Sequence, residues 1–220
     1  MKKNLLVVGN CNYSSWSLRP YMALSHSGMP FDIKRIALDT PTFKAEVAHY
    51  GGAGKVPLLV TAEDGVIWES LAICEYVAEH NRALWPMDSA LRAEARAVAC
   101  EMHAGFGAVR SLLPMNIRAR RRIAVTEAAE ADLDRIFEIW EKCRKRALSH
   151  GPWLYGSYSI ADAMFAPIAS RLVTYGIQCP PLVAAYRDHV VEDPHFKRWE
   201  QMALDESEVV AADEAGEPLA

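Results

Sequence analysis

The sequence predicts two domains, a small α/β domain followed by a domain made only of helices. Three observations support this division. Strand and helix patterns alternate over residues 1–81, strand patterns end after a short linker at 82–87, and helical patterns then fill 88–204. The remaining residues, 205–220, form an acidic tail that is expected to be flexible. A chain of 220 residues is long enough for two cores of this size.

The first half of the α/β domain is predicted to run strand, helix, strand. The apolar run Leu5–Val8 is typical of a buried strand. A helix is predicted over 16–27, because Gly28 is a typical helix C-cap and Pro30 follows it. A second strand is predicted over 33–38.

The second half of this domain is predicted to run helix, two strands, helix. The helix covers 40–50, and the two short strands cover 56–60 and 66–68. Residues 63–65 have the composition of a hairpin turn, and a final helix is predicted over 70–80. The order βαβ, α, ββ, α is that of a thioredoxin-like domain, with a mixed sheet and helices on both faces.

The second domain is predicted to be an all-α helical bundle. Apolar residues at steps of three and four predict one continuous helix from Asp88 to Leu113, which Pro114 ends. Ser159 and Asp162 have the spacing of a capping box, which we interpret as structural. The other helices are predicted to begin at Thr126 and Ser159 and to cover 182–189 and 194–202.

Composition and charge exclude several classes of protein. The formal net charge of −4 provides no attraction to nucleic acid or to an anionic membrane, so neither is expected as a partner. No apolar run reaches the roughly 18–20 residues that span a bilayer. The five cysteines are odd in number and never spaced Cys-x-x-Cys, which argues against a disulfide framework and against a metal site.

The start of the chain favours a cytoplasmic location. Met1-Lys2-Lys3 begins like a signal peptide, but the apolar stretch that follows is too short for one. Two charged segments are interpreted as inert. These are the basic run 118–122, expected to be a solvated surface, and the acidic residues of 205–217 in the tail.

A strand–turn–helix segment over 9–20 is the first candidate for chemistry. It carries Asn12, Tyr13, Ser14 and Ser15 directly before a helix. A helix N-terminus presents free N–H groups and a positive dipole end, so this turn is suited to hold an anion such as a thiolate.

Two further motifs suit a peptide-like ligand. In Lys55-Val56-Pro57 the proline stands at the start of a strand, and a cis bond there would turn the backbone of Val56 outward as an unpaired edge. In Glu69-Ser70 the serine is predicted to cap a helix, where its hydroxyl and N–H could receive a carboxylate. The Glu69 carboxylate could receive an ammonium group.

Taken in order, these motifs resemble a cytosolic glutathione transferase. The resemblance rests on the segments 12–19, 55–58, 69–73 and 159–162 and covers about residues 4–203. The entry into the first helix is most similar to the zeta and tau classes. The resemblance implies the glutathione transferase fold, glutathione as substrate or cofactor, a homodimer, and transfer of alkyl or aryl groups to glutathione from a small hydrophobic electrophile.

The resemblance also implies roles for individual residues. Lys55, Val56 and Pro57 would hold the cysteinyl part of glutathione, while Glu69 and Ser70 would hold its γ-glutamyl end. Residues that would line the electrophile cleft are Tyr13, His103, Phe106 and Arg110, the last three because 101–106 is similar to a beta-class segment and Arg110 follows on the same predicted face.

Three residues are candidates for contact with the glutathione sulfur. Aligned through the shared Ser-Trp pair, the zeta and tau serine falls on Asn12, whose amide can still donate a hydrogen bond. Ser14 is our first candidate and Asn12 the second, with Ser15 as a reserve or as the helix cap. A serine hydroxyl would act as a donor to the thiolate, which lowers the thiol pKa.

Three other functions remain open. A zeta-like chain could be an isomerase that uses glutathione as cofactor. Cys11-Asn12-Tyr13-Ser14 is a Cys-x-x-Ser spacing, which could mark thiol–disulfide exchange or deglutathionylation by an acidified Cys11. The asparagine at the aligned serine position also allows a glutathione-binding protein without turnover.

Overall fold

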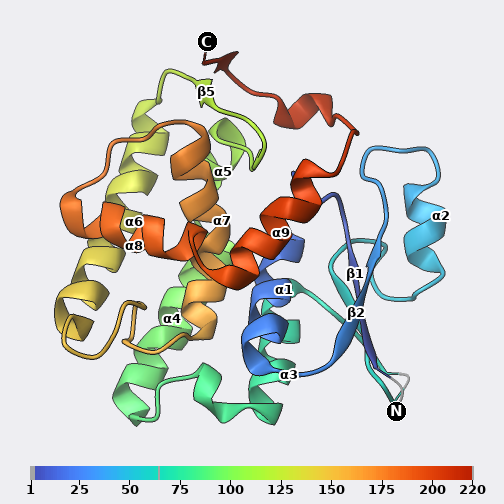
Figure 1. The fold of residues 1–220 in the computed structure, drawn as a ribbon, viewed down its shortest axis with the longest axis horizontal. Helices are drawn as coiled ribbons and strands as arrows, with labels where there is room; N and C mark the ends of the chain where they lie inside the picture. The colour runs from blue at the N-terminus through green and yellow to red at the C-terminus, as the bar shows by residue number, and fades with distance from the viewer. Residues whose placement is uncertain (1–2, 64, 220) are drawn as a thin grey trace.

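The computed structural model describes residues 3–63 and 65–219. Met1 and Lys2 of the predicted first domain, Asp64 of the predicted turn and Ala220 of the predicted tail lie outside these residues. The described chain forms a mixed sheet with helices on both faces, followed by a helical region (Figure 1), which confirms the predicted fold class.

The first domain is built on a four-stranded sheet in the order β2-β1-β3-β4. β1 and β2 are parallel, while β1–β3 and β3–β4 are antiparallel. The strands are β1 (Asn4–Val8), β2 (Phe31–Arg35), β3 (Leu58–Val60) and β4 (Val66–Trp68). The helices are α1 (Ser15–Ser27), α2 (Phe43–Ala48) and α3 (Ser70–His80).

Alternating residues of β1 explain why helices cover both faces of the sheet. Leu6 and Val8 belong to the main core, together with residues of α1 and α3. Val7 points to the other face and packs with Val47 of α2 and with Leu58. A strand that is apolar on both faces needs a cover on each side, so the run of four apolar residues at the start of the chain determines this layered arrangement.

The helical region contains α4 (Ser89–Ala104), α5 (Gly107–Leu112), α6 (Glu127–Ala147), α7 (Ile160–Thr174), α8 (Pro181–Val191) and α9 (Pro194–Leu204). α7 is almost entirely buried and packs against α1, so it joins the two domains. Its capping box is present as predicted, because the Ser159 N–H donates to the Asp162 carboxylate at 2.8 Å. No helix among residues 3–63 and 65–219 is both long enough and apolar enough to cross a membrane.

The predicted single helix from Asp88 to Leu113 is wrong, because the chain breaks it after Ala104. Phe106 has φ 59°, and α5 starts in a new direction at Gly107. Asp132 of α6 explains the break, since its Oδ2 accepts the N–H groups of Ala108 at 3.0 Å and Val109 at 3.1 Å. This carboxylate caps α5 from another helix.

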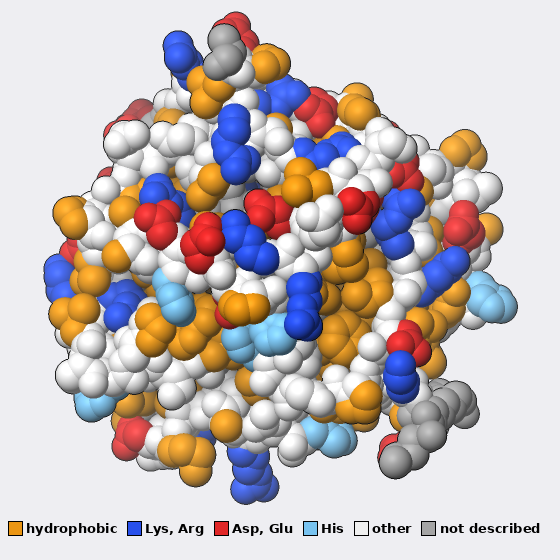
Figure 2. All heavy atoms as spheres, in the orientation of Figure 1, with side chains coloured by type: hydrophobic (Ala, Val, Ile, Leu, Met, Phe, Trp, Pro, Cys, Tyr) orange, Lys and Arg blue, Asp and Glu red, His pale blue; other side chains and the backbone are white. Residues whose placement is uncertain are grey.

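The acidic tail, which was expected to be flexible, packs against the basic run, which was expected to be a solvated surface. Arg118 donates to the carbonyl groups of Glu206 and Glu208, and Arg121 pairs with the Glu214 carboxylate. The short strands β5 (Arg121–Arg122) and β6 (Glu217–Pro218) then pair. Figure 2 shows basic and acidic side chains intermingled on the part of this face where the tail crosses the helical domain.

Candidate active site

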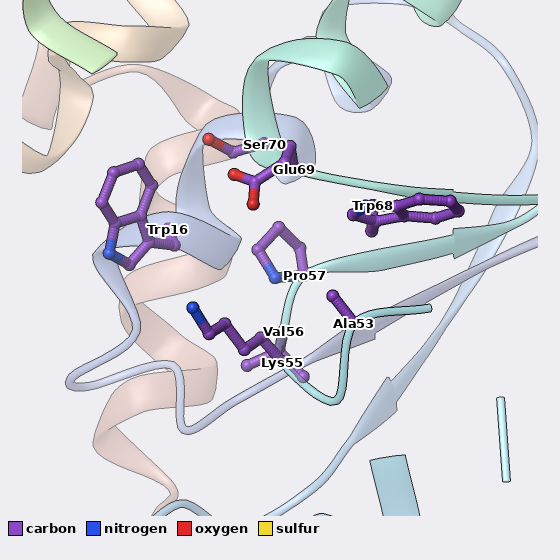
Figure 3. A pocket seen from close by; sticks show the side chains of 8 residues that line it. All are labelled: Trp16, Ala53, Lys55, Val56, Pro57, Trp68, Glu69 and Ser70. Carbon is purple, nitrogen blue, oxygen red and sulfur yellow. The ribbon is translucent and has the colours of Figure 1, made fainter. Parts of the chain in front are cut away.

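A small cavity lies where the N-terminal part of α1, the segment before β3 and the start of α3 meet. Its volume is about 180 Å³. We call it the first cavity, and Figure 3 shows its side chains grouped around Pro57. Its lining residues are Trp16, Ala53, Lys55, Val56, Pro57, Trp68, Glu69 and Ser70.

The backbone of Val56 forms one wall of the first cavity. The Val56–Pro57 peptide bond is cis, as the sequence predicted. β3 begins only at Leu58, and among the described residues neither the N–H nor the carbonyl of Val56 takes part in a backbone hydrogen bond. Val56 therefore offers a free donor and a free acceptor beside the cavity.

The start of α3 forms the opposite wall. Glu69 has φ 68°, a rare conformation for a residue other than glycine, and α3 begins at Ser70. Ser70 is thus the first helical residue and not the predicted cap. Its hydroxyl is buried without a hydrogen-bond partner among the described residues, and Figure 3 shows it beside the Glu69 carboxylate.

Trp16 closes the first cavity on the side of α1, a role that the sequence did not predict. Two guanidinium groups approach its ring, Arg19 at 4.2 Å and Arg110 at 5.1 Å from the ring centroid. The His103 ring meets it edge-on at 5.4 Å. These contacts hold the indole in place by cation–π and edge-to-face attraction.

A second cavity of about 440 Å³ adjoins the first and shares Trp16, Lys55 and Val56 with it. It lies between the two domains, because its walls come from α1, the β2–α2 connection, α5, α7 and the tail. Its lining residues are Tyr13, Ser14, Ser15, Trp16, Leu38, Phe43, Lys55, Val56, Arg110, Pro114, Met115, Arg171 and Asp213.

Ser14 and Ser15 stand at the N-terminus of α1 and line this second cavity. The Ser14 hydroxyl donates to the Ser17 hydroxyl oxygen at 2.7 Å, and Ser17 also accepts the Gly9 N–H at 3.2 Å. This places Ser17, which the sequence analysis did not single out, behind Ser14. Ser15 makes no side-chain hydrogen bond among the residues that the structure describes.

Asn12 faces away from both cavities. Its amide nitrogen donates to the Asn116 side-chain oxygen at 2.9 Å, and its side-chain oxygen accepts the Arg118 N–H at 2.8 Å. The side chain is fully buried and joins the turn to the helical domain. The side chain lines neither cavity, so its predicted donor role at the sulfur is not supported by its position.

Cys11 opens onto a different hollow, lined by β2 and the residues after α9. Its thiol is 2 % exposed, and its N–H donates to the Glu206 carboxylate at 2.6 Å. Burial and the Glu206 carboxylate raise the pKa of Cys11 well above the ordinary value. This environment is the opposite of the one that acidifies a reactive cysteine.

The predicted cleft residues lie at different places. Tyr13 and Arg110 line the second cavity, and the Tyr13 hydroxyl donates to Glu214 at 2.6 Å. Phe106 is 7 % exposed and belongs to the main core. His103 lines neither cavity, but its Nε2 lies 3.9 Å from the Glu69 carboxylate, and burial lowers its pKa.

The site contains no cluster suited to a metal. Among residues 3–63 and 65–219, no three His, Cys, Asp or Glu side chains are grouped so that they could hold a metal ion. The chemistry available here consists of free backbone groups, hydroxyl groups at two helix N-termini, and cationic side chains.

One family model matches the chain. Residues 13–80 match the model described as "Glutathione S-transferase, N-terminal domain", which covers the segment from the turn before α1 to the end of α3. The first domain therefore belongs to the glutathione S-transferase N-terminal domain family. No curated protein is similar enough to this chain to count as a match.

Solved structures share the fold over nearly the whole chain. A glutathione transferase homolog from Burkholderia gl BGR1 with bound glutathione is 24 % identical, with a TM-score of 0.71, and the match covers 93 % of this chain and 100 % of that one. A Tau class enzyme from mango, Mangifera indica, is 19 % identical, with 93 % and 97 % coverage and a TM-score of 0.63. Ure2p in complex with glutathione is 18 % identical, with 91 % and 94 % coverage and a TM-score of 0.68.

Proposed function

We propose that this chain binds glutathione in the first cavity and transfers it to an electrophile held in the second. The observation that carries this proposal is a pair of walls with unused hydrogen-bonding groups, the Val56 backbone on one side and the Ser70 hydroxyl on the other. A peptide with a free α-amino acid end complements both walls. The glutathione that is bound in the Burkholderia homolog has this chemistry.

The γ-glutamyl and cysteinyl residues of glutathione would each meet groups of complementary chemistry. The N-terminus of α3 and the Ser70 hydroxyl suit the γ-glutamyl carboxylate. The Glu69 carboxylate suits the ammonium group of the same residue. The Val56 N–H and carbonyl would pair with the cysteinyl residue, as an extended peptide pairs with a strand edge, and Lys55 adds a positive charge beside it.

The sulfur would then lie near the N-terminus of α1. Free cysteine has a pKa near 8.5, so only a few per cent of glutathione is thiolate at neutral pH. With a thiolate present, the Ser14 hydroxyl would turn its proton toward the sulfur, and Ser17 would donate its own proton to Ser14 while still accepting the Gly9 N–H. Ser14 is thus the donor and Ser17 a positioning residue.

The reaction itself needs no further catalyst group. The thiolate attacks the electrophilic carbon, a sulfur–carbon bond forms, and the leaving group departs with the bonding electron pair. The thiol proton is released to solvent before the attack. Ser15, at the same helix N-terminus, is the reserve donor if Ser14 stays paired with Ser17.

One observation favours a second candidate function, glutathione binding without turnover. In the structure the Ser14 hydroxyl is hydrogen-bonded to Ser17, and the Asn12 side chain is hydrogen-bonded to Asn116 and Arg118 and lines neither cavity. Thiol–disulfide exchange through Cys11 is disfavoured by burial and by Glu206. An isomerase that uses glutathione as cofactor needs the same activated thiolate and differs only in its substrate.

Three assays run in parallel test the proposal. We expect conjugation of 1-chloro-2,4-dinitrobenzene to glutathione, with little reduction of hydroxyethyl disulfide and little isomerisation of a maleyl substrate. Cys11→Ala should leave conjugation unchanged within about twofold. Glutathione binding without any of the three activities would support the second candidate, and disulfide reduction lost in Cys11→Ala would overturn the assignment.

The proposed function also leads to expectations about the location and the oligomeric state of the protein. We expect the protein to act in the cytoplasm, where glutathione is the main thiol buffer, and to form a homodimer. Light scattering coupled to size-exclusion chromatography tests the homodimer.

A further inference from the structure

The second cavity is lined by two arginines that have no acidic partner. Arg110 projects from α5 and donates to the His103 carbonyl at 3.1 Å. Arg171 projects from α7 and donates through Nε to the Leu113 carbonyl at 2.7 Å. Among the described residues no carboxylate oxygen lies within 4.0 Å of either guanidinium group.

Arg171 is a charged group with unused donors. It is 3 % exposed, and its terminal Nη1 has no hydrogen-bond partner in the described part of the chain. Arg19, which is fully buried, has no partner there on any guanidinium nitrogen. Buried charges in proteins are normally paired, so Arg171 and Arg19 are unusual in having no ion-pair partner within 4.0 Å among the described residues.

The cations act on one another. Burial and the positive charges of Arg171 and Arg110 lower the pKa of Arg19 to about 9. Burial and Arg110 lower the pKa of Arg171 to about 10. An anion bound in the second cavity would relieve the repulsion among these cations and could accept a hydrogen bond from Arg171, which lines the cavity.

The one acidic residue of the second cavity does not fill this role. Asp213 lines the cavity from the tail but makes no ion pair within 4.0 Å among the described residues. Its carboxyl is raised in pKa by burial. Lys55, Arg110 and Arg171 therefore leave the cavity with an excess of positive charge.

We propose that the second cavity binds a carboxylate between Arg110 and Arg171, so that the electrophile used by this protein is an organic acid. The planar guanidinium fork matches a carboxylate through paired hydrogen bonds. This inference rests on the proposed function for the identity of the second substrate. It replaces the expectation of a purely hydrophobic electrophile.

The layout of the cavity orients such a substrate. Ser14 and Ser15 line it from α1, whereas Arg110 and Arg171 line it from the helical domain. A substrate anchored at the arginines presents its other end to the thiolate. Glutathione carries a glycine carboxylate with the same chemistry, so the experiment must separate that source from the electrophile.

A matched pair of electrophiles tests the proposal, 4-chloro-3-nitrobenzoate and its neutral amide. In both reactions a sulfur–carbon bond forms at the ring carbon that carries chlorine, chloride leaves with the bonding electrons, and the thiol proton goes to the buffer. Each kcat/KM is divided by the rate without enzyme. We expect the corrected value to be at least about tenfold higher for the benzoate.

Variants of single residues test which side chains cause the preference for the benzoate over the amide. Arg110→Gln should lower the corrected kcat/KM for the benzoate about tenfold more than it lowers that for the amide. Asp213→Asn, which removes the opposing charge, should raise the preference for the benzoate. Arg187→Gln is the matched control, because Arg187 is partly buried on α8 and lines neither cavity.

Two results would overturn the inference. Equal corrected rates for benzoate and amide, with normal glutathione binding, would do so and would leave the proposed function intact. An equal loss of glutathione affinity in Arg110→Gln would assign the anion to the glycine carboxylate instead. If glutathione does not bind at all, the proposed function fails, and calorimetry with unreactive 4-nitrobenzoate against 4-nitrobenzamide still decides whether the arginines form an anion site.

Discussion

The two sides of the turn before α1 differ in whether their polar groups already have hydrogen-bond partners. On one side, Cys11 and Asn12 have their N–H groups bound by the Glu206 carboxylate, and the Asn12 side chain is bound to the loop at 116–118. On the other side, the groups that face the two cavities include a buried Ser70 hydroxyl and an Arg171 nitrogen that have no hydrogen-bond partner among residues 3–63 and 65–219.

This difference distinguishes groups that stabilise the fold from groups that are available to bind a ligand. A buried hydrogen-bonding group without a partner costs about 1–3 kcal/mol. A fold retains such groups only where something else compensates, and a ligand that binds there regains that energy. The occupied side therefore holds the domains together, while the open side is where glutathione and its electrophile should bind.

The largest expected effect is on catalysis at the open side. Ser14→Ala removes the donor to the thiolate, and we expect kcat/KM to fall about 100-fold, the scale for losing one donor to a developing or full negative charge. The pKa of bound glutathione, followed by thiolate absorbance, should rise in parallel. Ser15→Ala is the matched control at the adjacent position. A larger loss of kcat/KM in Ser15→Ala than in Ser14→Ala would show that Ser15 is the donor to the thiolate.

The next effect is on binding. Ser70→Ala removes a hydrogen bond to a carboxylate, worth about 1.5–3 kcal/mol, so the Kd for glutathione should rise at least about tenfold. The free protein should be as stable or slightly more stable, because the lost hydroxyl has no partner. Calorimetry and thermal unfolding measure the two quantities, and an unchanged Kd with reduced stability would mean that Ser70 is structural.

Asn12→Ala should give the reverse pattern. Two buried partners, the Asn116 oxygen and the Arg118 N–H, lose their hydrogen bonds, so the free energy of unfolding should fall by about 1–3 kcal/mol. The Kd for glutathione should change less than twofold. Urea unfolding and calorimetry test these two expectations. A variant with unchanged stability and lost activity would instead indicate that Asn12 is the donor to the thiolate.

The smallest effect concerns pH and Cys11. The folded state raises the pKa of this thiol, whereas the unfolded chain releases the proton near pH 8.5. Stability is thus lost as pH rises above about 8.5, by at most about 1.4 kcal/mol per pH unit for this one proton. Cys11→Ala should flatten this part of the urea-unfolding profile between pH 8.5 and 10. Equal slopes, or fast alkylation of native Cys11 at pH 7, would contradict the assignment.

The sequence was sufficient for the order of the elements in the first domain, because local signals determine it. The cis bond at Pro57 was predicted from the fold context, since few X-Pro bonds are cis. The C-cap at Gly28 and the capping box at Ser159 lie within a few residues of the helix ends that they define. The break at Phe106 could not be predicted in this way, since the carboxylate that caps α5 comes from Asp132 in a later helix.

The site was predictable in part for the same reason. Ser14 and Ser70 follow from motifs at strand–helix junctions, and Lys55 and Val56 follow from the proline at the start of a strand. Arg171 had no signal, because it lies in the apolar pattern of α7 and meets the cavity only after the domains pack. The tail and the basic run have opposite charges that could have suggested contact, but sequence proximity did not link them.

Calorimetric titration compares glutathione with cysteinylglycine, which lacks the γ-glutamyl residue, and tests most directly whether partnerless groups mark the binding site. We predict that the unsubstituted protein binds glutathione at least about tenfold more tightly than cysteinylglycine, and that Ser70→Ala removes most of this difference in affinity. No heat from glutathione at millimolar concentration, or an unchanged difference in Ser70→Ala, would contradict the account.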